Sequence, residues 1–285
     1  MNAWSAATSK RSLATALAPL AALPMYDLPE LQAANDALWG GIAERLAADG
    51  LEEVPARLTR TTELEALWTS PALLLAQTCG YPLVTTLGAQ VQVVATPRYR
   101  APGCEGPFRR SAIVVRAHEP AHRLADLRGA RGAVNDMMSD SGMNLFRAAI
   151  APLAGEQPFF RSLVVTGAHL ASVEAVAFGE ADVAAIDAVT WAHIGDLRPD
   201  LAWRLRVLEW TDRTPGLPLI TAAASGARTL AALRRALAEV AADPQLAEAR
   251  EILRLEGFSL LPRHYYQLTS HMEARAQALG YPLLR

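Results

Sequence analysis

Two serines and a glycine stand where an apolar, helix-forming run begins. The run covers residues 139–153 and opens with Ser139, Asp140, Ser141 and Gly142, here called the serine loop. The first amides of a helix lack intrahelical partners and carry positive partial charge, so a helix that follows a strand can bind an anion. Two hydroxyls would add donors, and the glycine lets a ligand approach the backbone. The pattern indicates a site for a tetrahedral oxyanion; the alternative is a plain N-cap, which contributes about 1 kcal/mol.

Two further polar residues follow predicted strands in the same half of the chain. His169 comes after one such strand and begins the next helix, and Asp187 follows the strand after that. In open α/β sheets, ligands bind beyond the carboxyl ends of the strands, so both residues are expected near the serine loop. Either could instead act only as a helix cap. The negative charge of Asp140 would repel a dianionic ligand unless its side chain turns away from the pocket.

The other half of the chain offers Tyr26, Gln77 and Thr78. They stand at the ends of predicted strands, in the stretches LPMYD and LLLAQTCG. A tyrosine ring can contact the apolar part of a ligand while its hydroxyl forms a hydrogen bond with the polar end. We expect these three residues to face the serine loop across a cleft.

Short β-type runs alternate with helical ones along most of the chain. A helix is predicted from Pro29 to Gly50, a short strand at 57–60, and helices from Thr229 to the end. Strands separated by helical runs imply right-handed crossovers and a mainly parallel sheet. The segment 97–107 is rich in Pro, Gly and Arg and marks a crossing between two units.

The predicted fold is therefore α/β with two lobes, each a mainly parallel sheet flanked by helices, and a ligand cleft between them. Lobe 1 is expected to be discontinuous and to comprise residues 20–107 and 208–285. Lobe 2, residues 108–207, is inserted into it. The C-terminal helices are expected to return to lobe 1.

The composition excludes several classes of protein. The 285 residues carry a net charge of −2 without a basic face, which argues against a nucleic-acid partner. No run approaches the ~20 apolar residues that span a bilayer, so the protein is not expected to be membrane-embedded. His118 and His122 stand four residues apart but straddle Pro120, which disfavours a shared helical face, so neither a metal nor a cofactor is expected. Cys79 and Cys104 could be thiols or one disulfide.

Four stretches resemble the substrate-binding proteins of phosphate, phosphite and phosphonate ABC importers, which have the type II periplasmic-binding-protein fold. They are LPMYDLPE, LLLAQTCGYPL, the serine loop, and VTGAH followed by GEADVAAID. The resemblance implies capture of a small phosphonate-like or phosphate-like oxyanion by hinge closure of the lobes, with an ABC transporter permease as a partner.

The same resemblance assigns roles to individual residues. It implies that Ser139, Ser141 and Gly142 hold the oxyanion and that His169 adds a contact. Tyr26 would come from the opposite lobe. Family members that bind a ligand amine use carboxylates, for which only Asp187 and Asp212 are candidates.

Two other functions remain open from the sequence. Cys79, His169 and Asp187 have the residue types of a Cys-His-acid site, so the chain could be an enzyme of cofactor biosynthesis on the same fold. It could also be a ligand-sensing module. A cytoplasmic location is expected, because the short apolar run after Lys10 and Arg11 leads directly into the first predicted strand. The periplasm is the alternative.

Overall fold

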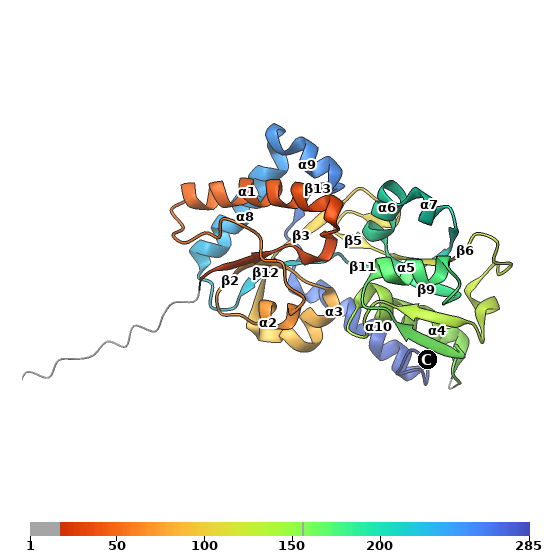
Figure 1. Ribbon diagram of the computed structural model, residues 1–285. Coiled ribbons are helices and arrows are strands. Elements are labelled where there is room, and N and C mark those ends of the chain that lie inside the picture. Colours follow the sequence, from red (N-terminus) through yellow and green to blue (C-terminus); the bar gives the residue numbers. More distant parts are fainter. Residues whose placement is uncertain (1–17, 156) are drawn as a thin grey trace, which may run out of the picture.

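Two lobes and a small sheet between them make up the protein (Figure 1). The computed structural model describes residues 18–155 and 157–285, so the basic pair Lys10 and Arg11 lies outside it. No helix within the described residues is long and apolar enough to cross a membrane.

Lobe 1 is built on a five-stranded sheet with the order β1-β2-β12-β3-β13. Its strands are β1 (Leu20–Ala22), β2 (Leu73–Gln77), β3 (Val91–Tyr99), β12 (Leu219–Ala222) and β13 (Leu255–Ser259). β1 and β2 are parallel, whereas β12 runs antiparallel to β2 and β3, and β13 antiparallel to β3. The sheet is therefore mixed.

Helices cover both faces of this sheet. They are α1 (Gln32–Ala48), α2 (Leu64–Trp68), α3 (Gly80–Pro82), α8 (Ala227–Ala242) and α9 (Ala247–Ile252). Pro29 opens the turn that leads into α1, and Leu38, Ile42 and Leu46 recur on its buried side. α1, α8 and α9 pack on one face of the sheet, and α2 packs on the other.

Lobe 2 contains a second five-stranded sheet, with the order β10-β6-β9-β7-β8. Its strands are β6 (Ser111–Arg116), β7 (Arg131–Val134), β8 (Ser162–Val165), β9 (Val183–Asp187) and β10 (Leu205–Trp210). β7 is parallel to β8 and β9, and β6 is antiparallel to β9 and β10. The helices are α4 (Leu145–Ala154), α5 (His169–Ala177), α6 (Ala188–Leu197), α7 (Pro199–Ala202) and α10 (Gln267–Ala278). α4 and α10 share one face, and α5, α6 and α7 the other.

A three-stranded sheet joins the lobes and is called the hinge sheet below. It consists of β4 (Cys104–Glu105), β5 (Phe108–Arg109) and β11 (Thr214–Pro215), in the order β11-β5-β4. The chain enters lobe 2 through β4 and β5 and returns through β11, and β5 and β11 pair antiparallel. Both crossings between the lobes are therefore bonded to each other.

The predicted two-lobed α/β fold is confirmed, with three differences in detail. Both sheets are mixed: β12 and β13, which the sequence pattern did not reveal, add antiparallel strands to lobe 1, and β6 runs antiparallel to its neighbours in lobe 2. No strand forms at 57–60. α10 packs against α4 of lobe 2, whereas the other C-terminal helices pack on lobe 1. The segment that follows α10 also contacts lobe 2, because Arg147 of α4 donates to the Pro282 carbonyl at 2.8 Å. The boundaries 107/108 and 207/208 remain a proposal.

Candidate functional site

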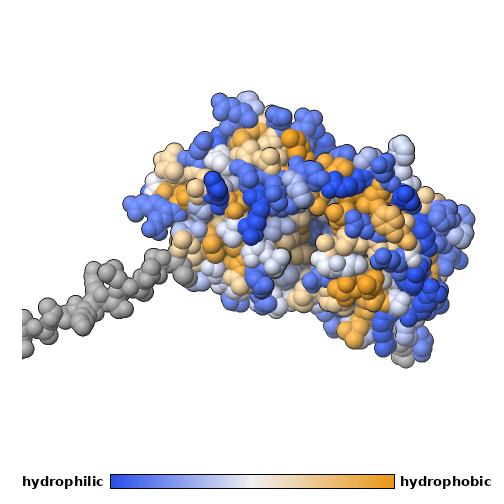
Figure 2. Space-filling view, viewed as in Figure 1, coloured by the Kyte–Doolittle hydropathy of each residue, from blue (hydrophilic) through white to orange (hydrophobic). Residues whose placement is uncertain are grey.

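A cleft of about 630 Å3 lies between the lobes. Lobe 1 contributes the turn η1 (Pro24–Tyr26) and residues around α2, and lobe 2 contributes the serine loop and the starts of α5 and α6. In the space-filling view, apolar surface reaches the junction of the lobes from both sides (Figure 2). The cleft is in the size range of pockets for small organic ligands.

The serine loop follows β7 after a short connection and begins the π-helical turn η6 (Asp140–Asn144) that leads into α4. Ser139 is its N-cap, because its Oγ accepts the Gly142 amide at 2.9 Å. The Asp140 amide donates to Cys79 Sγ at 3.3 Å. Two of the backbone amides that were predicted to bind an anion are thus already hydrogen-bonded within the protein. Fewer backbone donors are therefore available to a ligand than predicted.

Gly142 has a steric reason to be a glycine. A Cβ at this position would lie 1.8 Å from Oδ1 of Asn135 and 3.1 Å from His169. The loop therefore packs tightly against both neighbouring residues, and Gly142 itself is buried.

Asp140 turns away from the cleft. Its carboxylate accepts hydrogen bonds from Thr214 Oγ1 at 2.9 Å and from Asn144 Nδ2 at 3.1 Å, and the side chain is completely buried. Because the Asp140 carboxylate points away from the cleft, it repels an anion bound at the serine loop less than the sequence suggested.

Asp187 caps α6 and connects the lobes. Its Oδ1 accepts the amides of Val189 and Thr190 and the hydroxyl of Tyr26, the last at 2.9 Å. Burial and the Asp187 carboxylate raise the pKa of Tyr26, so this phenol stays protonated and donates. A residue of lobe 1 is thereby bonded to the start of a lobe 2 helix.

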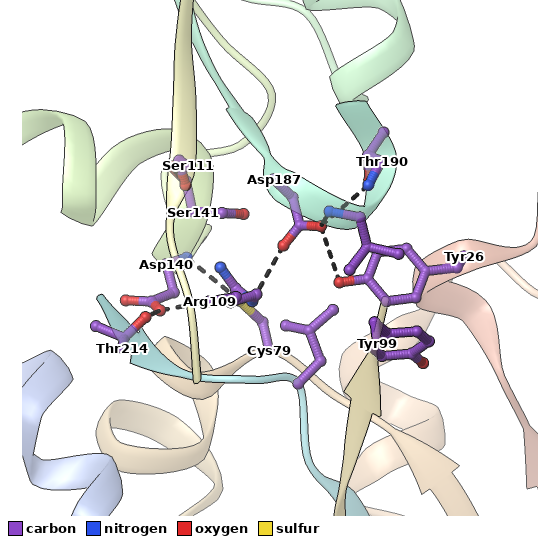
Figure 3. A network of polar contacts seen from close by, with 12 residues as sticks. Tyr26, Cys79, Tyr99, Arg109, Ser111, Asp140, Ser141, Asp187, Thr190 and Thr214 are labelled. Carbon is purple, nitrogen blue, oxygen red and sulfur yellow. Dashed lines mark hydrogen bonds and ion pairs between the residues drawn. The ribbon is translucent and has the colours of Figure 1, made fainter. Parts of the chain in front are cut away.

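Arg109 lies between the two aspartates, as Figure 3 shows. Its guanidinium is 3.0 Å from Asp187 and 3.7 Å from Asp140. Burial would lower the pKa of Arg109, but the carboxylates of Asp187 and Asp140 outweigh this effect and raise the pKa, so the group stays charged. The sequence offered no sign of this residue beyond its position two residues after the crossing segment 97–107.

Two neutral histidines line the cleft. Nε2 of His169 is 2.9 Å from Ser141 Oγ, and its Nδ1 has no hydrogen-bond partner among the described residues. Burial lowers the pKa of His169 to about 4, and burial together with the charge of Arg254 lowers the pKa of His193 to about 4. Neither therefore supplies positive charge at neutral pH.

The structure separates the predicted site residues into two groups. Those that line the cleft are Tyr26, Ser139, Ser141, His169 and Asp187. Those behind its wall are Gln77, Thr78, Asp140 and Gly142. Gln77 donates to Tyr99 and to the Leu217 carbonyl, and Thr78 is completely buried, because both side chains belong to the interior of lobe 1 rather than to its surface.

The walls of the cleft carry negative charge. Its carboxylate residues are Asp27, Glu63, Glu65, Asp136 and Asp187, whereas no arginine or lysine in the described part of the chain lines it. No group of three or more potential metal ligands occurs within the described residues. Both cysteines are free thiols.

The sequence matches, over residues 20–266, the family described as the periplasmic phosphonate substrate-binding protein of ABC transporters. The chain belongs to this family. A search of curated proteins found no match.

Membership in this family makes the chain a substrate-binding protein rather than an enzyme. The geometry agrees, since His169 pairs with Ser141 rather than Cys79, and burial and Asp140 raise the pKa of the Cys79 thiol.

Solved structures share the fold of this phosphonate-family protein. A binding protein component of an ABC phosphonate transporter from Pseudomonas aeruginosa has a TM-score of 0.74 and 15% identity, covering 92% of this chain and 87% of that one. PhnD1 from Prochlorococcus marinus, in complex with methylphosphonate, has a TM-score of 0.73 and 14% identity, covering 91% and 98%. A Xanthomonas citri protein bound to ATP has a TM-score of 0.69 and 16% identity, covering 92% and 98%.

Proposed function

We propose that the chain binds a phosphonate with its anionic head against Ser139, Ser141 and His169. The observation that carries this proposal is the meeting of two serine hydroxyls and an imidazole on one wall of the cleft, at a helix start. Tyr26 and Asp187 form the neighbouring wall, where the lobes are already bonded. The proposal gives no ligand contact to Gln77, Thr78 or Asp140, since none of them lines the cleft.

The organic part of the ligand carries positive charge in this proposal. The cleft lacks a lining arginine or lysine among its described residues, and Glu63, Glu65 and Asp136 have no basic partner there. A bare dianion would meet this negative field without compensation, whereas a zwitterion would place its ammonium group near the carboxylates. An aminoalkylphosphonate fits this charge pattern better than methylphosphonate or inorganic phosphate.

Calorimetric titration tests both parts of the proposal. We expect 2-aminoethylphosphonate to bind more tightly than methylphosphonate, phosphate or sulfate. At 100 times its Kd a ligand adds about 2.7 kcal/mol to the free energy of unfolding, so a melting shift should accompany binding. Binding of all the simple oxyanions with equal affinity would contradict the charge argument, and binding of none of these compounds would contradict the function.

A matched pair of serine variants locates the head group. Ser141→Ala removes a hydroxyl from the cleft, and we expect a loss of affinity of roughly tenfold, the value of one hydrogen bond to a charged group. Ser162→Ala removes a hydroxyl from the exposed strand β8 and should leave the Kd unchanged. Equal Kd values for the two variants would contradict the placement of the head at the serine loop.

We infer that the loaded protein closes and delivers its ligand to the permease of an ABC transporter. The volume of the cleft exceeds what a compact phosphonate fills, so binding should contract it. Small-angle scattering should then show a smaller radius of gyration with ligand than without it. The family description is periplasmic, while the cytoplasmic location expected from the sequence stays a prediction; fractionation of cells that express the native protein distinguishes the two.

A further inference from the structure

The hinge sheet brings an arginine into the interior between the lobes. Arg109 lies on β5, is 2% exposed, and approaches both Asp140 and Asp187. It does not line the cleft. Its influence on a ligand must therefore pass through the residues that it contacts.

Each carboxylate beside Arg109 belongs to a different wall of the site. Asp140 stands in the serine loop between Ser139 and Ser141 and also accepts from Thr214 of the hinge strand β11. Asp187 begins α6 and accepts from Tyr26 of lobe 1. One guanidinium thus connects the serine loop, the start of α6 and the hinge strands β5 and β11.

We propose that Arg109 is a positioning residue, which holds the serine loop and the start of α6 in the orientation that ligand binding requires. The inference rests on the proposed phosphonate site. Because Arg109 lies on a strand through which the chain crosses between lobes, a hinge movement would act on both walls through this side chain.

The chemistry of arginine suits this role. Its planar guanidinium can face two carboxylates at once, whereas a lysine ammonium presents a single point charge on a flexible stem. A buried ion pair contributes little net stability compared with a well-packed apolar group, so its main physical consequence here is fixed geometry.

The test compares two arginines of lobe 2 and its hinge. Arg109→Met removes the proposed contact, and Arg116→Met removes an arginine that pairs with Asp182 away from the cleft. At a temperature where both variants are folded, we expect the Kd for 2-aminoethylphosphonate to rise about tenfold in Arg109→Met and to stay within about twofold in Arg116→Met. Arg109→Lys should give an intermediate loss.

A second variant covers the case in which Arg109→Met does not fold. Asp140→Asn keeps the size of the side chain but removes the charge that faces Arg109, and Asp140 lies outside the cleft. We expect its Kd to rise at least about threefold. Unchanged Kd values in both Arg109→Lys and Asp140→Asn would overturn the proposal.

A measurement without ligand separates this proposal from the proposed function. The amide NMR resonances of residues 139–144 should move in Arg109→Lys but not in Arg116→Met. If the wild-type chain bound no phosphonate, the function would fail while this result still supported positioning by Arg109. If the resonances stayed in place in both variants, positioning by Arg109 would be wrong whatever the ligand.

Discussion

Two clusters of arginine and aspartate in this chain have the same chemistry and different surroundings. In the inner cluster, Arg109 lies between Asp140 and Asp187, and all three side chains are 2% exposed or less. In the outer cluster, Asp182 of lobe 2 accepts from Arg116 and Arg131 at 2.9 and 2.8 Å, and its members are partly exposed. The inner cluster joins lobe 2 to the hinge sheet and reaches lobe 1 through the hydrogen bond of Tyr26 to Asp187, whereas the outer one lies within lobe 2.

The exposure of each cluster to water determines whether its ion pairs can matter to function. Water screens the outer cluster, so its pairs should add little to stability and nothing to the relative position of the lobes. The inner charges have left water, so each must keep its partner, and removal of one leaves another buried without compensation. Of the two clusters, only the inner one should therefore affect the geometry of the cleft.

The largest expected effect comes from breaking the inner cluster. Arg109→Met leaves two buried carboxylates without a positive partner, and we expect it to lower the free energy of unfolding by about 3–5 kcal/mol. Arg116→Met should cost about 1 kcal/mol, because the Asp182 carboxylate keeps Arg131 and remains partly solvated. Urea denaturation measures both. Equal losses would mean that the two clusters do not differ as the structure indicates.

A smaller effect is expected from packing around the serine loop. In Gly142→Ala the new methyl group would displace the Asn135 side chain, and we expect a loss of about 1–3 kcal/mol in stability together with weaker ligand binding. Gly195→Ala is a suitable control, since a Cβ there meets no atom within 4 Å. A Gly142→Ala protein with unchanged melting temperature and Kd would show that the loop tolerates movement.

The smallest effect is expected from removing a titratable side chain from either region, which should change how the free energy of unfolding depends on pH. The folded-state pKa of His169, about 4, is below its unfolded value near 6.5, so the unfolded chain binds more protons between these values. Stability should therefore rise with pH across this range and fall as the solution is acidified through it. His169→Gln should reduce this slope and change stability by less than about 1 kcal/mol at pH 7.5.

His118→Gln serves as the control for His169→Gln, because His118 is exposed.

The outer cluster should affect stability at lower pH than His169 does. Arg131 and Arg116 lower the pKa of Asp182, so its contribution is complete above about pH 4 and is lost on further acidification. Stability curves of His169→Gln and Asp182→Asn that differ from wild type over the same pH range would contradict this separation.

The sequence was informative where a local pattern determines a local structure. Ser139 as an N-cap and the helix after Pro29 follow from residue types and periodicity, and both are present. The missed strands have weaker patterns. β13 contains Gly257 and follows a helical run, and β12 is a short apolar segment whose period cannot distinguish a strand from a helix.

The site was harder to predict, because side-chain direction depends on tertiary packing. Tyr26, Ser141 and His169 lie on the cleft as their strand ends suggested, but Gln77 at another strand end points into the core. Arg109 could not be identified, since its partners are 31 and 78 residues further along the chain and nothing local marks it as buried.

The most direct test of the account is a crystal structure of the protein grown with 2-aminoethylphosphonate. The account predicts phosphonate oxygens within hydrogen-bonding distance of Ser139, Ser141 and His169, with the ammonium group toward the carboxylates of the cleft. Density for the phosphonate elsewhere, with the Ser141 hydroxyl still bonded only to Ser139 and His169, would contradict it.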